Sequence, residues 1–198
     1  MDMDLYLRST DIVDWLHPEV LAKARDLAKG LPSLSDIAMR CFVWVRDSVR
    51  HIGDYDIQTV ACSASEVLTA SSGVCYAKSH LLAALLRAGG IPAGFCYQRL
   101  SVDDNGPPFC LHGLTAVHLP GIGWYRVDPR GDNDKLRADF CPPEERLCFT
   151  PHLPGEADLP EIWPDPLPVV LDALRTFRNK DELWKHLPDI PILDRSAE

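Results

Sequence analysis

Apolar residues recur three and four positions apart through the first half of the chain, which is the spacing of helices with one buried face. Residues 19–29 carry such a stripe and are followed by a glycine and a proline, so we expect a helix that ends there. Ser35 can cap a second helix that runs to about Arg50. Residues 63–66 read Ser-Ala-Ser-Glu, the spacing of a capping box, and predict a short third helix. The polar stretch at residues 51–62 is expected to be a loop.

The next segment, residues 75–88, is apolar on nearly every face of a helix and is closed by two glycines. Such a helix belongs in the centre of a fold. The pattern then changes to strands, with candidates at residues 93–102, 111–119 and 123–128. A Pro-Gly-Ile-Gly turn joins the last two as a hairpin. Helices first and an antiparallel sheet afterwards predict an α+β domain.

Beyond Arg130 the chain is rich in proline, so we expect only short elements there, among them helices near residues 167–178 and 180–187. Aromatic residues are spread through this tail and can anchor it. We therefore expect the tail to wrap the preceding part of the chain rather than to fold apart from it.

The overall composition is that of one globular domain, with 198 residues of which 46% are hydrophobic and 25% charged. A net charge of −9 argues against nucleic-acid binding, which requires a basic surface, and equally against anionic membrane surfaces. No apolar run is long enough to span a membrane, and the acidic start of the chain is unlike a signal segment. We expect a cytoplasmic protein without a nucleic-acid or membrane partner. Nothing in the sequence indicates an oligomeric state.

The seven cysteines are irregularly spaced, and none forms a Cys-x-x-Cys pair. Their odd number argues against a disulfide framework, and their spacing argues against a zinc site. In a reducing compartment they are expected to be free thiols, most of them small buried hydrophobes. The acidic loops lack the ordered ligand set of a calcium site, and glycine-rich phosphate signatures are absent. We expect neither a metal nor a cofactor.

One cysteine, Cys75, stands where a turn becomes the central helix. There the unpaired amides of the first turn and the positive end of the helix dipole favour the thiolate, which is the nucleophilic form. His112 and Asp128 lie on the two strands of the predicted hairpin, within a residue or two of opposite positions. Cysteine acyl transfer requires a thiolate, a histidine that exchanges protons and a group that orients the histidine. The alternative interpretation is that Cys75 is a buried structural residue and that the other two are coincidental.

Other residues near the thiol are weaker candidates. His80 lies more than a turn along the helix and around it, so it cannot reach the thiol. His51 ends a helix and begins a loop that could border the thiol, but helix C-termini attract histidines for dipole reasons alone. Lys78, on the first turn, could lower the pKa of the thiol, but we expect it to be a solvated helix lysine.

The backbone amide of Cys75 is a natural donor to an oxyanion, because it is free at the start of a helix. A second donor is usual at such sites. The upstream residues Trp44, Tyr55 and Gln58 are open alternatives for it, and none has a spacing that decides the matter.

Three motifs in the right order and spacing resemble the transglutaminase-like superfamily. Gly73-Val74-Cys75 and the apolar helix that follows resemble its nucleophile helix. Residues 112–124, from His-Gly-Leu-Thr to Gly-Trp, resemble its histidine strand, and Val127-Asp128-Pro129 resembles its aspartate strand. The resemblance implies Cys75 as nucleophile, His112 as general acid and base, and Asp128 as the orienting residue.

The resemblance covers roughly residues 14–131 and implies a papain-like α+β fold, in which N-terminal helices and a central nucleophile helix pack on an antiparallel sheet. The chain would form a single domain over residues 1–198, with the Pro-rich extension 132–198 wrapping the core. One departure is Gly113-Leu114, where many members have Ala-Trp. This departure alters the wall of the site and leaves its specificity open.

The implied function is that of a thiol enzyme that acts on amide bonds through a cysteine thioester. The thioester could pass to water, as in an amidohydrolase or peptidase, or to an amine, as in an acyltransferase. A peptide, a protein or a small amide would each fit as substrate. The alternative is a catalytically silent peptide- or protein-binding module that retains the fold, although the presence of all three residues argues against it.

Overall fold

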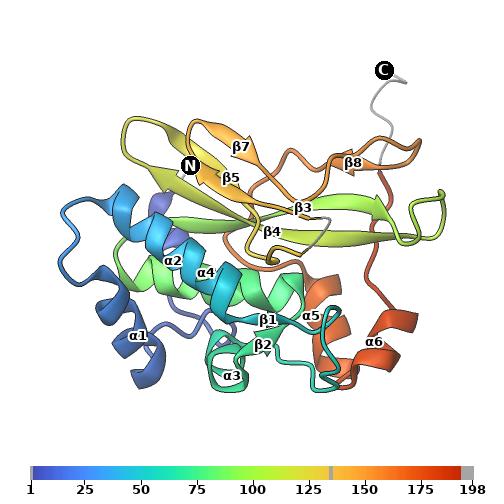
Figure 1. Cartoon of the computed structure of the whole chain (residues 1–198), viewed down its shortest axis with the longest axis horizontal. Helices are drawn as coiled ribbons and strands as arrows, with labels where there is room; N and C mark the ends of the chain where they lie inside the picture. Colours follow the sequence, from blue (N-terminus) through green and yellow to red (C-terminus); the bar gives the residue numbers. More distant parts are fainter. Residues whose placement is uncertain (1, 134–135, 193–198) are drawn as a thin grey trace.

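The computed structural model describes residues 2–133 and 136–192. Helices form one layer and an antiparallel sheet forms the other (Figure 1), so the predicted α+β architecture is confirmed. The main sheet has the strand order β5-β4-β3-β8. In the described part of the chain, no helix is long and apolar enough to cross a membrane.

The elements are, in chain order, η1 (Met3–Tyr6), α1 (Pro18–Ala28), α2 (Leu34–Ser48), β1 (Arg50–His51), α3 (Ala64–Ala70), β2 (Ser72–Gly73), α4 (Cys75–Ala88), β3 (Ala93–Ser101), β4 (Phe109–Leu119), β5 (Gly123–Val127), β6 (Asp139–Cys141), β7 (Glu144–Arg146), β8 (Ala157–Asp158), α5 (Pro168–Thr176) and α6 (Lys180–Lys185).

Helices α2 and α3 each begin after a serine that caps the first turn. The expectation that Ser35 caps α2 is wrong, because the hydroxyl of Ser33 accepts the hydrogen bond from the backbone N–H of Asp36, at 3.1 Å. The capping box before α3 is confirmed, since the side chains of Ser63 and Glu66 each accept a hydrogen bond from the other residue's backbone N–H. Each cap satisfies a donor that the first turn of a helix leaves unpaired.

The loop expected over residues 51–62 begins with a strand residue instead. His51 pairs with Gly73 in the short parallel contact between β1 and β2, and the N–H of Ile52 donates to the carbonyl of Gly73 at 3.2 Å. A pair of two-residue strands has no alternating pattern, so it leaves no signal in the sequence. This contact brings the segment after α2 beside the residues that lead into α4.

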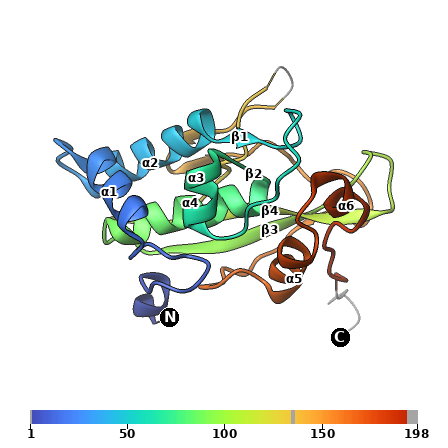
Figure 2. The same cartoon turned by 90° about the horizontal axis from the view of Figure 1, so that it is seen from below.

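Helix α4 is the buried centre of the helical layer (Figure 2). It contacts α1, α2 and α3 as well as strands β3 and β4. Every side chain from Cys75 to Arg87 is buried, including the charged ones. The Nζ of Lys78 donates to the carbonyls of Val49, at 2.5 Å, and Arg130, at 2.7 Å. The expectation of a solvated lysine is therefore wrong. Its amine is buried, which lowers its pKa to about 7, and backbone oxygens accept its hydrogen bonds, as buried polar groups require.

The first turn of α4 lies directly on strand β4. A Cβ added at Gly113 would lie 2.8 Å from Cδ1 and 3.1 Å from Cα of Tyr76. The hydroxyl of Tyr76 donates to the carbonyl of Leu111, and the hydroxyl of Ser79 donates to the carbonyl of Gly113 at 3.2 Å. A glycine in a strand commonly marks such a close approach. The departure from alanine at residue 113 thus has a packing reason.

The tail beyond Arg130 is attached to both layers of the fold. Strand β8 extends the sheet beside β3, and Phe95 and Trp163 exchange two backbone hydrogen bonds of 2.7 and 2.8 Å. On the helical side, the N–H of Val60 donates to the carbonyl of Arg178 at 3.1 Å. The two predicted helices of the tail are present as α5 and α6, whereas the short strands β6, β7 and β8 were not anticipated.

Replacing Gly113 by alanine is expected to push the start of α4 away from β4. The added methyl group would overlap Tyr76, and such overpacking typically costs about 1–3 kcal/mol of unfolding free energy. Urea unfolding of Gly113→Ala measures this loss. Gly89→Ala serves as the matched control, since its Cβ would meet nothing closer than 3.3 Å. Equal stability of the two variants would contradict the packing argument.

Candidate active site

Cys75 is the first residue of α4 and is buried, with 6% of its surface exposed. The residue before it, Val74, is the N-cap and makes no side-chain hydrogen bond to the first turn. Among the described residues, none accepts a hydrogen bond from the backbone N–H of Cys75. A free amide and the positive end of the helix dipole therefore meet beside the sulfur, an arrangement that stabilises negative charge.

The structure places His112 and Asp128 in direct contact. The Nε2 of His112 lies 2.8 Å from Oδ2 of Asp128, and both side chains are buried. In the register of β4 and β5, Thr115 pairs with Val127. Asp128 thus follows β5 directly and stands diagonally across from His112, within the reach of a diagonal pair.

Asp128 is held as a carboxylate by three donors. Besides His112, the backbone N–H of Arg130 donates to Oδ1 at 3.0 Å and that of Cys148 donates to Oδ2 at 3.2 Å. Burial alone would raise the pKa of Asp128, but the charge and hydrogen bond of His112 and the two backbone donors outweigh it and lower the pKa. This buried residue is therefore an anion that fixes the ring of His112.

The second nitrogen of His112 is left for the thiol, because Asp128 occupies Nε2. Burial lowers the pKa of His112, but the charges of Asp128 and Cys75 and the hydrogen bonds to both residues raise it to about 10. An imidazolium at neutral pH is the natural partner of a cysteine thiolate. The structure thus brings Cys75, His112 and Asp128 together, and their catalytic roles stay a prediction.

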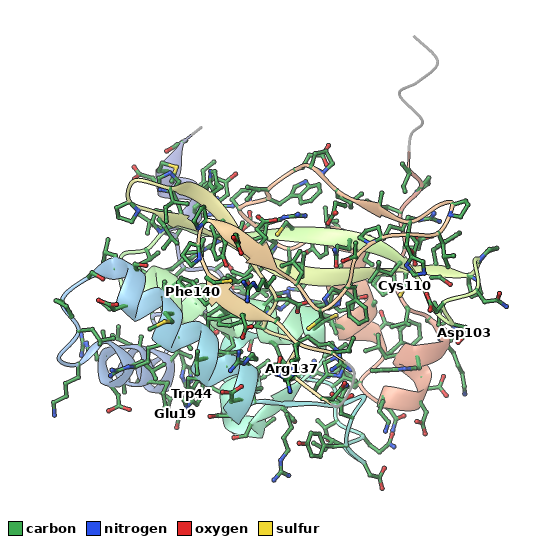
Figure 3. All side chains as sticks on the ribbon, turned by 45° about the horizontal axis from the view of Figure 1, so that its top comes forward. Glu19, Trp44, Asp103, Cys110, Arg137 and Phe140 are labelled. Carbon is green, nitrogen blue, oxygen red and sulfur yellow. The ribbon has the colours of Figure 1, made fainter. Side chains whose placement is uncertain are left out.

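Cys75 and His112 open into one cavity of about 560 Å³. Its walls come from the core on one side and from the tail on the other. Cys110 and Asp103, both labelled in Figure 3, mark the end of the molecule where this cavity lies. The tail contributes Leu136, Cys148, Phe149, Thr150, His152, Glu156, Trp184 and Leu187 to the lining.

Two residues of the tail touch the site itself, and sequence reasoning missed both. The ring of Phe149 packs edge-on against His112, with centroids 4.9 Å apart. The backbone N–H of Cys148 binds Asp128. No motif marks either residue, because their roles depend on a contact between segments far apart in the sequence.

The two other histidines considered from the sequence, His80 and His51, differ in whether they reach the cavity. His80 is buried, and its Nδ1 lies 2.7 Å from the carbonyl oxygen of Cys62, away from the cavity. His51 does line the cavity. All seven cysteines are free thiols. Within residues 2–133 and 136–192, no three His, Cys, Asp or Glu side chains gather in a way that could hold a metal ion.

The pair of His112 and Asp128 should stabilise the fold within a defined pH window. The contribution of His112 is complete below its ordinary pKa of about 6.5 and is lost as the pH rises through about 10. That of Asp128, whose pKa is lowered, is complete above about pH 4 and is lost at lower pH. We expect the unfolding free energy lost in His112→Gln to be largest between these limits and to shrink toward pH 10.

Urea unfolding at fixed ionic strength measures this dependence. The variants His112→Gln, Asp128→Asn and the double variant form a cycle that isolates the interaction of the pair. A coupling that stays constant from pH 5 to pH 10 would contradict the raised pKa of His112.

The chain is similar to a known protein family and to solved structures. A family model described as the transglutaminase-like superfamily matches residues 22–129. Among solved structures, a candidate cysteine protease from Cytophaga hutchinsonii is 23% identical, with a TM-score of 0.51 over 65% of this chain and 42% of that protein. The periplasmic domain of TgpA from Pseudomonas aeruginosa is 20% identical, with a TM-score of 0.47 over 65% of this chain and 48% of that one. No curated protein matches the sequence.

The likeness to the Cytophaga protein shows a shared fold, and this chain spans less than half the length of either neighbour. The family model covers more than half of the 198 residues and ends just beyond Asp128. On that match, the chain belongs to the transglutaminase-like superfamily.

Proposed function

We propose that this protein is a thiol enzyme that acts on amide bonds, with Cys75 as nucleophile, His112 as general acid and base, and Asp128 as the residue that orients His112. The observation that carries the proposal is the position of Cys75. It stands at the uncapped start of α4, in the same cavity as an imidazole bound to a buried carboxylate. These are the parts that cysteine acyl transfer requires.

In the first half of the reaction, the thiolate of Cys75 attacks the carbonyl carbon of an amide, and a carbon–sulfur bond forms. The carbonyl oxygen becomes an oxyanion, which the free N–H of Cys75 stabilises. The imidazolium of His112 then donates its proton to the amide nitrogen, the carbon–nitrogen bond breaks, and an amine or ammonia leaves. A thioester on Cys75 and a neutral His112 remain.

In the second half, neutral His112 takes a proton from water or from an amine as that nucleophile attacks the thioester. The carbon–sulfur bond breaks, and the product leaves as a carboxylic acid or as a new amide. The thiolate and the imidazolium are restored together. Asp128 stays ionised throughout and keeps Nε2 of His112 engaged, so that Nδ1 exchanges the proton.

The size and the lining of the cavity are compatible with a peptide or protein as substrate. A volume of about 560 Å³ is in the range of sites that hold small ligands or peptide side chains. Its apolar walls include Leu100, Leu111 and Phe149, which suit an apolar side chain beside the reacting amide. The Cytophaga hutchinsonii neighbour, described as a candidate cysteine protease, supports the same class of substrate.

Alkylation by iodoacetamide tests the thiolate–imidazolium pair. We expect Cys75 to be labelled rapidly at pH 6, because a neighbouring imidazolium favours the thiolate form of a cysteine, and we expect His112→Ala to slow that labelling by ~10–100-fold. Asp128→Ala should act in the same direction. Mass spectrometry of the labelled peptide, over a series of pH values, gives the rates.

Cys110 provides the internal control, since it lines the same cavity and burial together with the charge of Cys75 raises its pKa to about 12. Its labelling should be slow at pH 6 and insensitive to His112. The proposal would be contradicted if the labelling rate of Cys75 rose with pH as for an ordinary thiol, with a pKa of about 8.5, and was the same in His112→Ala.

An acyl-enzyme is the second expected outcome. The activated ester p-nitrophenyl acetate should release a burst of p-nitrophenolate equal to the enzyme concentration and leave an acetyl group on Cys75. Cys75→Ala should give neither. The absence of both with the wild-type protein would favour the silent binding module.

An added primary amine then competes with water, and the ratio of amide to acid product separates an acyltransferase from a hydrolase.

A further inference from the structure

His51 lies beside the strand that leads into the nucleophile. It is paired with Gly73 in the parallel contact of β1 and β2, two residues before Cys75. Neighbouring strands are about 4.8 Å apart, so the imidazole is within a side chain's length of the start of α4. His51 lines the cavity together with Cys75 and His112.

The hydrogen bonds of His51 define which nitrogen carries the proton. Its Nδ1 accepts a hydrogen bond from the backbone N–H of Gly53, at 3.2 Å. A neutral imidazole that accepts at one nitrogen donates at the other, so Nε2 carries the hydrogen. Among the described residues, none accepts that hydrogen, and His51 lines the cavity with 8% of its surface exposed. The Nε2–H is therefore a donor without a partner in the described part of the protein.

The surroundings of His51 hold it in the neutral form. Burial lowers its pKa well below the ordinary value, and the positive charges of Arg130, Lys78 and His112 lower it further. Asp54 lies 4.0 Å from Nδ1, but its carboxylate is engaged by two hydrogen bonds of 2.8 Å from Arg130. A neutral imidazole donates one hydrogen bond without supplying a mobile proton, so it does not compete with His112 as the acid.

The other candidates for a second donor are placed elsewhere. Trp44 lies on α2, far from the end of the molecule marked by Cys110 (Figure 3), and neither Trp44 nor Gln58 lines the cavity. Tyr55 does not line the cavity of Cys75; it borders a second hollow, which His51 also lines. Within the cavity, the hydroxyl of Tyr76 is already bound to the carbonyl of Leu111.

We infer that His51 is a further catalytic residue, whose Nε2–H forms, with the backbone N–H of Cys75, the pair of donors that stabilises the oxyanion. This inference rests on the thioester chemistry proposed above. Two donors on one developing negative charge are a common design in acyl transfer, and removal of one typically lowers the rate by about 10²–10³-fold.

Two reactions of the same sulfur separate this role from any effect on the thiolate. Acylation by p-nitrophenyl acetate passes through an oxyanion, whereas alkylation by iodoacetamide does not. We expect His51→Ala to slow the acylation burst by ~100-fold and to change the rate of Cys75 alkylation by less than about threefold. His51→Gln, which restores an N–H donor, should recover part of the acylation rate, and His17→Ala is the control for a histidine on another surface.

Each outcome decides the inference. An equal loss in both reactions would show that His51 acts on the thiolate or on the fold around it, and would overturn the oxyanion role. Unchanged acylation, or no difference between His51→Gln and His51→Ala, would overturn it as well. Failure of the proposed function is recognised separately, because the wild-type protein would then show no acylation burst and its alkylation would ignore His112.

Discussion

The close packing of the first turn of α4 on strand β4 sets the distance between Cys75 and His112. Gly113 permits the approach, since any side chain there would overlap Tyr76. The hydroxyl of Ser79 bonds to the carbonyl of Gly113, and the hydroxyl of Thr115 returns a bond to the carbonyl of Ser79 at 3.4 Å. Both bonds lie just after His112 on the strand. Because a misplacement of 1 Å can cost a hundredfold in rate, a reactive pair needs such a rigid support.

The two fully buried ionisable side chains next to the site, Asp128 and Lys78, both form hydrogen bonds with neighbouring groups. Asp128 is fully buried and binds three donors, and Lys78 is fully buried and binds carbonyl groups at 2.5 and 2.7 Å. One of those carbonyls belongs to Arg130, whose N–H in turn binds Asp128. The ammonium therefore joins the end of α2 to the turn that carries the carboxylate. Removing any single partner would leave an unpaired polar group in the interior, which is expensive.

Much of this arrangement is predictable from local pattern. Long helices and strands follow from periodicity, and the approach of Cys75, His112 and Asp128 follows from a helix start and a hairpin. What escaped prediction depends on contacts across the fold. The pair of β1 and β2 is too short to show a period, and Lys78 looks like a surface residue until the turn at Arg130 is placed over it. Phe149 has no motif, and only the docked tail brings it to His112.

Because the tail forms part of the cavity wall, the cavity is completed late in the synthesis of the chain. Synthesis proceeds from the N-terminus, so Cys75, His112 and Asp128 leave the ribosome before the residues that complete their surroundings. Cys148 supplies a donor to Asp128, and Trp184 and Leu187 close the far wall of the cavity. A nascent chain thus carries all three side chains of the candidate site while their cavity is still open on one side. A finished cleft is formed only after Leu187 has been added.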